Sequence, residues 1–229
     1  WLSGRFDTEA LGDYLPEGRR INFQLRSGKS TLASMVLTDA SFRVPVTEGR
    51  YTVSGYLRSA APVQKAIQIT TSENPVELQP LHFELSKSLK LQGNQAPELK
   101  DIKGWMNGEL TSLAALRGNV VILDFWGYWC GPCIQAMPQL MELHDDYHDK
   151  GVVIVAVHDD SVRSIAELKA NLVNARQRSW GGRDLPFIVA LDGGGDQVDE
   201  QGLKYRGSTT AAYGIRSFPT SLVIDREGI

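Results

Sequence analysis

The sequence is poor in the residues that build disulfide frameworks and metal centres. Its 229 residues include two cysteines, four histidines and four methionines. Both cysteines belong to one short motif, Cys130 to Cys133, so no pair remains for a structural bridge. The count excludes a small fold held together by several disulfides. It does not by itself identify a cellular compartment.

Long apolar runs and strong charge are also missing. No run approaches the roughly 20 apolar residues that a helix needs to cross a bilayer. The chain starts at Trp1 rather than at methionine, and no signal-peptide pattern follows. We therefore expect a mature or trimmed chain and leave a lost signal or lipid anchor open. The net charge of −3 gives no general attraction to nucleic acid or to an anionic membrane.

The glycine-rich stretch at 193–195 does not have the features of a phosphate-binding loop. No helix with the Lys-Ser/Thr pair follows the three glycines. We expect a flexible turn there, next to a strand over 187–191.

The first part of the chain, residues 1–92, is predicted to be all-β. Apolar and polar residues alternate with a period of two, and turn signals recur at short intervals. Alternation of this kind favours a small β-sandwich, loosely similar to carboxypeptidase-regulatory or transthyretin-like modules. We expect this domain to serve as a spacer, a docking surface or a dimer interface. The alternating apolar positions are Ile21, Phe23, Leu25, Phe42, Val44, Val46, Tyr51 and Val53.

A polar segment with glycine and proline, residues 93–97, is interpreted as a linker. The remainder, 98–229, alternates strand and helix patterns. Continuous apolar runs at 120–123 and 152–157 predict buried parallel strands. Helices are expected over 132–150 and over an apolar stripe from Val162 to Val173, the latter capped by Asp160 or Ser161.

The two cysteines lie where a predicted strand turns into a predicted helix. The unpaired N–H groups and positive dipole end of a helix N-terminus stabilise a thiolate at Cys130. A thiolate is the nucleophile of thiol–disulfide exchange, so Cys130 is expected to attack first. Cys133, one helical turn further and less exposed, is expected to resolve the mixed disulfide.

The run from Trp129 through Cys130, Gly131, Pro132 and Cys133 matches the active-site motif of thioredoxins. From about Gln95 onward the chain most resembles the TlpA/ResA-like thiol–disulfide oxidoreductases of the bacterial cell envelope. The resemblance implies an α/β thioredoxin-like fold whose final strand and helix are absent from this chain. It also implies an extracytoplasmic location, with a membrane anchor outside the chain left open.

The same resemblance implies partners and roles. Substrates would be protein thiols or disulfides, an upstream reductase or membrane electron donor would recharge the dithiol, and no organic cofactor would be needed. In the second signature, residues 214–220, Pro219 is expected to be cis and to face the cysteines, with Phe218 docking a substrate strand. Trp129 would shield the site, and Gly131 and Pro132 would tune its redox potential.

Asp124 lies on the strand that leads to the dithiol. Burial there should raise its pKa, so the carboxylate could accept the proton of Cys133. The alternative is a hydrogen-bonded strand aspartate without a catalytic role. ResA-like proteins usually have a glutamate three residues after the second cysteine, where this chain has Ala136.

Three other functions stay open. A thioredoxin-fold peroxidase is disfavoured because Trp126 and Cys130 occupy the proline and threonine positions of the peroxiredoxin motif, counted from Cys133. An oxidase of secreted proteins would need a higher redox potential, and a non-catalytic envelope interaction module would not need the dithiol.

A metal site at His144, His148 and His158 is disfavoured for want of further ligands. His82 is expected to be an ordinary strand residue.

Overall fold

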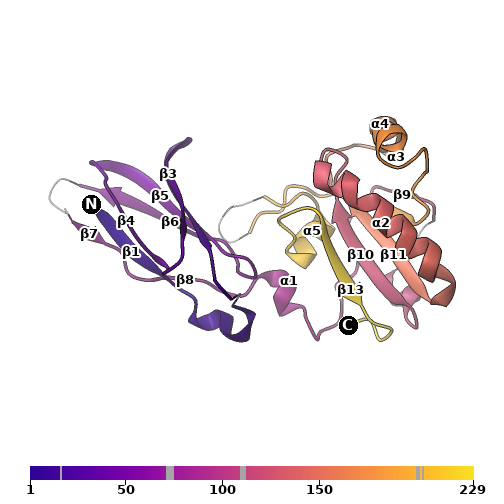
Figure 1. The fold of residues 1–229 in the computed structure, drawn as a ribbon, viewed down its shortest axis with the longest axis horizontal. Helices are drawn as coiled ribbons and strands as arrows, with labels where there is room; N and C mark the ends of the chain where they lie inside the picture. Colours follow the sequence, from indigo (N-terminus) through magenta and orange to yellow (C-terminus); the bar gives the residue numbers. More distant parts are fainter. Residues whose placement is uncertain (16, 71–74, 109–111, 200–201, 203) are drawn as a thin grey trace. The chain divides into compact units, whose positions relative to one another are not determined.

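The chain divides into two units, Trp1–Lys90 and Leu91–Ile229, when its internal contacts are grouped (Figure 1). The computed structural model describes residues 1–15, 17–70, 75–108, 112–199, 202 and 204–229.

The first unit contains two β-sheets. In one sheet, β1 pairs antiparallel with β4 and parallel with the short strands β7 and β8. The other has the antiparallel order β3-β2-β5-β6. The bounds are β1 Leu2–Asp7, β2 Ile21–Ser27, β3 Ser30–Leu37, β4 Ser41–Val44, β5 Gly49–Tyr56, β6 Val63–Ile69, β7 Val76–Glu77 and β8 Leu81–His82, with a 3-10 helix η1 at Glu9–Tyr14 and a helical turn α1 at Lys87–Lys90.

One apolar core serves both sheets of this unit. Phe23 on β2 and Phe42 on β4 are buried, and their rings stack with centroids 4.6 Å apart. Successive residues of β2 point to opposite faces, so the alternate residues Ile21, Phe23 and Leu25 enter the core together. The alternation predicted for these positions is confirmed.

Sequence reasoning missed two strands of this unit. In β1 the apolar alternation is interrupted by Gly4, because a Cβ there would come within 2.8 Å of the ring of Phe42. In β3 nearly every side chain is exposed, Leu32 to 57%, so the strand has no buried face to reveal it. His82 lies at the end of β8, where its Nδ1 is 2.8 Å from Oδ2 of Asp7, as an ordinary strand residue.

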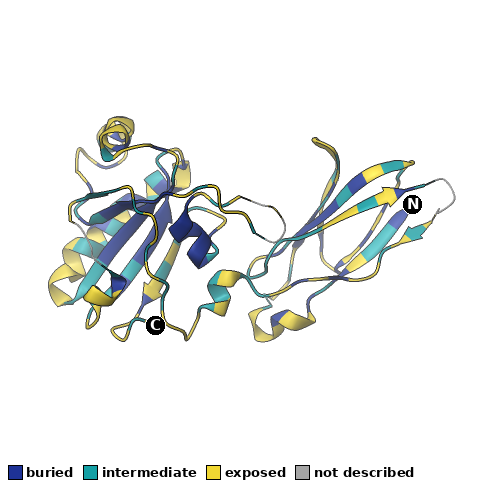
Figure 2. Ribbon diagram, turned by 180° about the vertical axis from the view of Figure 1, so that it is seen from behind, coloured by how far each residue is buried: buried dark blue, intermediate teal, exposed yellow. Residues whose placement is uncertain are grey.

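The second unit is built on a five-stranded sheet with the order β13-β10-β11-β12-β9. The three central strands are parallel, and β13 and β9 are antiparallel to their neighbours. The bounds are β9 Gly104–Met106, β10 Val120–Trp126, β11 Val152–His158, β12 Ile188–Leu191 and β13 Thr220–Ile224. Figure 2 shows β10 and β11 as largely buried strands.

The two faces of this sheet have separate apolar cores. One core joins both cysteines to α2, α3 and the even-numbered side chains of β10 and β11, and the other joins the odd-numbered side chains to α5. The helices are α2 Gly131–Tyr147, α3 Ile165–Asn171, α4 Val173–Arg178 and α5 Ser208–Tyr213, with 3-10 helices η2 Leu113–Leu116 and η3 His148–Lys150. No helix in the described parts of the chain has the length and apolarity to cross a membrane.

The helix after β11 differs from its prediction. Its N-cap is Ser164, whose side chain accepts a hydrogen bond from the N–H of Glu167. Asp160 and Ser161, the predicted caps, are engaged elsewhere: Asp160 N–H donates to the carbonyl of Arg206, and Ser161 donates to Asp159. The predicted apolar stripe from Val162 to Val173 does not continue to its last residue. Val173 is 44% exposed because α3 ends before it.

Two further segments refine the predictions. The helix expected over 132–150 is α-helical only to Tyr147, which is 44% exposed. The segment interpreted as a linker, 93–97, hydrogen-bonds within the second unit: Ala96 N–H donates to the carbonyl of Gly228. The domain boundaries at 92 and 98 stay a prediction.

Candidate active site

The two cysteines form a disulfide at the N-terminus of α2. Cys130 is the N-cap residue: its backbone is extended and its Sγ accepts a hydrogen bond from the N–H of Cys133 at 3.2 Å. Pro132 lies in the first turn, where proline costs no helical hydrogen bond. Cys130 retains 5% exposure and Cys133 none. Cys130 is therefore the more exposed of the two cysteines, and its sulfur lies where a helix stabilises negative charge.

Asp124 faces the same core as the cysteines. Ile122 and Trp126, two positions away on either side along β10, both belong to that core, and alternate strand residues share a face. Asp124 is 2% exposed, and its Oδ1 accepts a hydrogen bond of 2.6 Å from the hydroxyl of Ser221. Burial raises the pKa of Asp124 to about 6, and the Ser221 hydrogen bond offsets part of the rise. The expected direction of this shift is confirmed.

The loop before β13 contributes Phe218 to the core that contains the dithiol. The peptide bond between Phe218 and Pro219 is cis. Thr220 pairs with Phe125 across the sheet, so Pro219 comes one position beyond this pair, next to the end of β10. The Phe218 ring packs against the core that contains both cysteines, and Pro219 is exposed.

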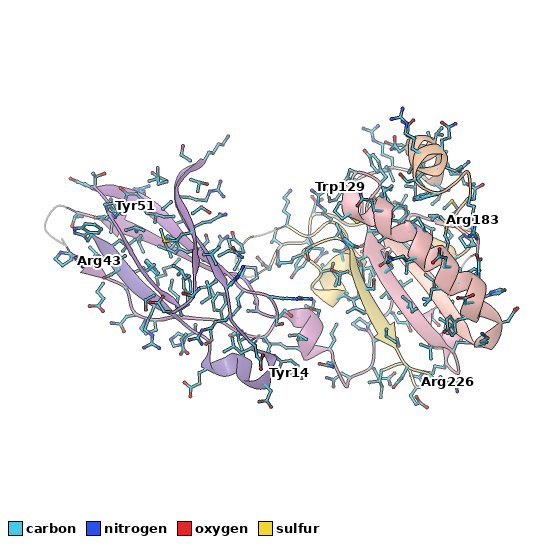
Figure 3. The ribbon with its side chains drawn as sticks, viewed as in Figure 1. Tyr14, Arg43, Tyr51, Trp129, Arg183 and Arg226 are labelled. Atoms are coloured by element: carbon cyan, nitrogen blue, oxygen red, sulfur yellow. A yellow bond between two sulfur atoms is a disulfide. The ribbon has the colours of Figure 1, made fainter. Side chains whose placement is uncertain are left out.

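Trp129 lies at the N-terminal end of α2 and is 44% exposed (Figure 3). Its indole Nε1–H donates to Oδ2 of Asp159 at 2.9 Å. Its ring meets the ring of Phe218 in a T-shaped contact with centroids 5.8 Å apart. The guanidinium of Arg206 lies over the indole, 4.4 Å from its centroid. Residues from three separate segments therefore surround the side chain that precedes Cys130.

His158 supports the turn that leads into the dithiol. Its Nε2 accepts the backbone N–H of Tyr128 at 3.0 Å, and its Nδ1 lies 2.8 Å from the carbonyl of Asp159. One ring nitrogen accepts and the other donates, which is the pattern of a neutral imidazole. Burial lowers the pKa of His158, in agreement with that state.

Asp192, at the end of β12, holds the start of α5. It is fully buried and accepts hydrogen bonds from the N–H groups of Gly193, Thr209 and Thr210 and from the Thr210 hydroxyl. Burial raises the pKa of this carboxyl, against the effect of its hydrogen bonds. Asp192 thereby anchors the helix that precedes the Phe218–Pro219 loop.

The Redoxin family model matches residues 91–229, more than half of the chain. The chain belongs to the Redoxin family. Its relatives include the thiol–disulfide oxidoreductase ResA of Bacillus cereus, 33% identical over 62% of this chain and 69% of that protein. The thioredoxin-like protein YneN of Bacillus subtilis is also 33% identical, over 60% of this chain and 68% of its own length.

Among solved structures, a thioredoxin-like superfamily protein, SPOA0173, aligns with a TM-score of 0.46 at 28% identity, covering 58% of this chain and 80% of that chain. The redoxin match and the ResA relatives show that this chain is a thioredoxin-like thiol–disulfide oxidoreductase of the ResA type. The predicted family is confirmed, and the second unit has the thioredoxin-like fold.

The remaining histidines do not gather into a metal site. His144 and His148 stack on α2 with ring centroids 4.7 Å apart, while His158 lies in the core beside Trp126. Within the described residues, no group of three or more histidine, cysteine, aspartate or glutamate side chains is arranged to hold a metal ion.

Sequence reasoning did not find Asp159, Arg206 or Asp192 as parts of the site. Asp159 follows a predicted strand directly, and polar residues at the carboxyl end of a parallel strand are a usable signal. Arg206 lies in a segment without periodicity, so no local pattern relates it to Trp129.

Proposed function

We propose that this redoxin reduces disulfides in other proteins, with Cys130 as the attacking thiolate and Cys133 as the resolving thiol. The observation that supports the proposal best is the placement of Cys130. Its sulfur caps α2, accepts an N–H hydrogen bond and is the less buried of the pair. A helix N-terminus lowers a thiol pKa and so favours the reactive thiolate.

The proposed reaction starts from the reduced dithiol. The Cys130 thiolate attacks one sulfur of the substrate disulfide, a mixed disulfide forms, and the other substrate sulfur leaves as a thiolate. Cys133 then gives up its proton and attacks Sγ of Cys130, which releases the second substrate thiolate. Two electrons have passed to the substrate, and the Cys130–Cys133 disulfide remains.

Asp124 is the proposed acceptor of the Cys133 proton. It faces the core that contains Cys133, and with a pKa of about 6 it is mostly ionised at neutral pH. A base with a pKa just below the working pH combines availability with proton affinity. Trp129, Gly131 and Pro132 form the proposed rim of the site, and Phe218 and Pro219 the proposed docking strand.

The dithiol stores the electrons itself, so the proposal requires no organic cofactor. A reduced dithiol protein or a membrane electron donor must restore the thiols after each turnover. The TlpA/ResA resemblance supports a location in the cell envelope, which fractionation of cells producing the protein would test.

The first unit has a separate proposed role. Two sheets on a single apolar core favour a β-sandwich, which we propose acts as a spacer or docking module for the redox domain.

A trapping experiment tests the redox proposal. Cys133→Ser should leave reduced protein covalently bound to insulin through Cys130, because the resolving thiol is missing. Dithiothreitol should release the adduct, and the matched variant Cys130→Ser should form none. Equal adducts with both variants, or none with either, would contradict the assigned roles. Rapid consumption of hydrogen peroxide without added thiol carriers would favour a peroxidase instead.

A further inference from the structure

The indole of Trp129 is held from several sides although it is half exposed. Gly127 lies beneath it: a Cβ at this position would come within 2.7 Å of Nε1. Asp159 accepts the indole N–H, and Phe218 meets the ring edge to face. The guanidinium of Arg206 lies over the indole.

Arg206 contacts both the indole and the indole's hydrogen-bond acceptor. Its Cζ is 4.4 Å from the Trp129 ring centroid, and its Nη1 is 3.4 Å from Oδ2 of Asp159. The Asp159 carboxylate is fully buried, whereas the Arg206 side chain is 54% exposed. A half-exposed ion pair contributes little by itself, so the placement of the guanidinium over the indole is the more informative feature.

The backbone is fixed at Arg206 and at the two residues that follow it. Its carbonyl accepts the N–H of Asp160 at 3.0 Å. The next residue, Gly207, has φ +139° and lies so close to Asp192 that a Cβ would come within 2.1 Å of its Oδ2. Ser208 N–H then donates to the carbonyl of Gly193 at 2.6 Å. The guanidinium therefore projects from an anchored backbone.

We propose that Arg206 is a positioning residue that fixes the Trp129 indole as the wall against which a protein disulfide docks beside Cys130. The inference rests on the proposed reduction of protein disulfides. A residue that acts only on docking changes the KM for large substrates and leaves the thiol chemistry unchanged.

Two disulfide substrates separate docking from chemistry. With insulin, Arg206→Ala in the full chain should raise KM about threefold to tenfold and keep kcat within about twofold, the scale of one partly exposed cation–π contact. With 2-hydroxyethyl disulfide, which is too small to span the indole wall, the rate should not change. An unchanged KM for insulin, or an equal loss with both substrates, would overturn the proposal.

Two further variants distinguish stacking from charge. Arg206→Lys keeps a cation near Asp159 but loses the planar group, so it should behave like Arg206→Ala. Full rescue by lysine would overturn the assignment to stacking. The matched control is Arg183→Ala: Arg183 has a similar exposure of 47% and pairs with Asp145 at 2.8 Å, and its loss should leave both rates unchanged.

The indole N–H resonance reports the position of Trp129 without any substrate. In a ¹⁵N spectrum, Trp129→Phe identifies the resonance. Arg206→Ala should shift it and speed its exchange with water, while the resonances of buried Trp126 and Trp180 stay in place. An unmoved resonance would overturn the proposal. If the wild-type protein reduced neither disulfide, the proposed function would fail, and the resonance would still decide whether Arg206 positions the indole.

Discussion

The two units of the chain bury different kinds of side chain. Among the described residues of the first unit, the buried polar side chains are Thr8 and Ser54, and none of them is charged. The described part of the second unit buries three carboxylates and a histidine: Asp124, His158, Asp159 and Asp192. Burying a charge is costly, and buried titratable side chains cluster at functional sites. The four buried titratable side chains therefore mark the second unit as the one that performs chemistry.

The buried acids of the second unit also differ from one another. Asp159 and Asp192 each accept several hydrogen bonds, which compensate for lost water. For Asp124 the hydrogen bond from Ser221 is the one compensating contribution to its pKa, which rises to about 6. A buried acid with few partners is able to exchange a proton, whereas a fully bonded one serves to hold structure.

The largest stability effect is expected in the apolar core of the first unit. Phe23→Ala should lower the free energy of unfolding by about 3–5 kcal/mol, because a fully buried ring is lost and a cavity remains. Urea unfolding followed by circular dichroism should give the same loss at pH 5 and pH 8. The control Leu32→Ala, at a side chain 57% exposed, should change stability by less than about 0.5 kcal/mol. A strongly pH-dependent loss would contradict the conclusion that no charged side chain is buried among the described residues of the first unit.

A somewhat smaller loss is expected at the anchor of α5. Asp192→Ala leaves the N–H groups of Thr209 and Thr210 without their acceptor and should cost about 3 kcal/mol in unfolding free energy. Asp192→Asn, which keeps one acceptor oxygen, should cost less, and Asp196→Ala at a fully exposed side chain should cost almost nothing. Equal stability of Asp192→Ala and the wild type in the same urea titration would refute the anchoring role.

At Asp124 a substitution is expected to raise the free energy of unfolding rather than lower it. Its folded pKa of about 6 exceeds the ordinary value of 3.8, so the folded protein favours the protonated form. The contribution of this pKa shift to the free energy of unfolding is fully present below about pH 4 and is lost as the pH rises through 6. Asp124→Asn should therefore raise the free energy of unfolding by up to roughly 3 kcal/mol at pH 7.5 and by almost nothing at pH 4.

The same variant separates stability from catalysis. Asp124→Asn should slow the attack of Cys133 on the mixed disulfide by on the order of 100-fold, the typical effect of losing a general base. Stopped-flow fluorescence with insulin measures this step. The control is Asp146→Asn, at an exposed carboxyl of α2. It should alter neither the free energy of unfolding nor the rate at which Cys133 attacks. A stability gain of the same size at pH 4 and pH 7.5 would rule out ionisation as its cause.

Local sequence patterns were enough to predict the elements around the dithiol. Apolar runs predicted β10 and β11, and the predicted strand before the cysteines with the predicted helix after them indicated a strand-to-helix turn. In the structure α2 begins at Gly131, next to Cys130. These features depend on residues within a few positions of one another, so periodicity and turn chemistry reveal them. Elements without a buried face, such as β3, and very short ones, such as β9, left no such pattern.

By itself, the sequence placed the two cysteines at a helix N-terminus and Asp124 on the strand before them, because these features follow from neighbours along the chain. Only the tertiary structure decided what surrounds Trp129. Asp159 is 30 positions away from it and Arg206 is far beyond, in a segment without regular structure. Their meeting depends on which strands lie side by side and on Asp192 holding the start of α5. Periodicity within one segment contains no information about either.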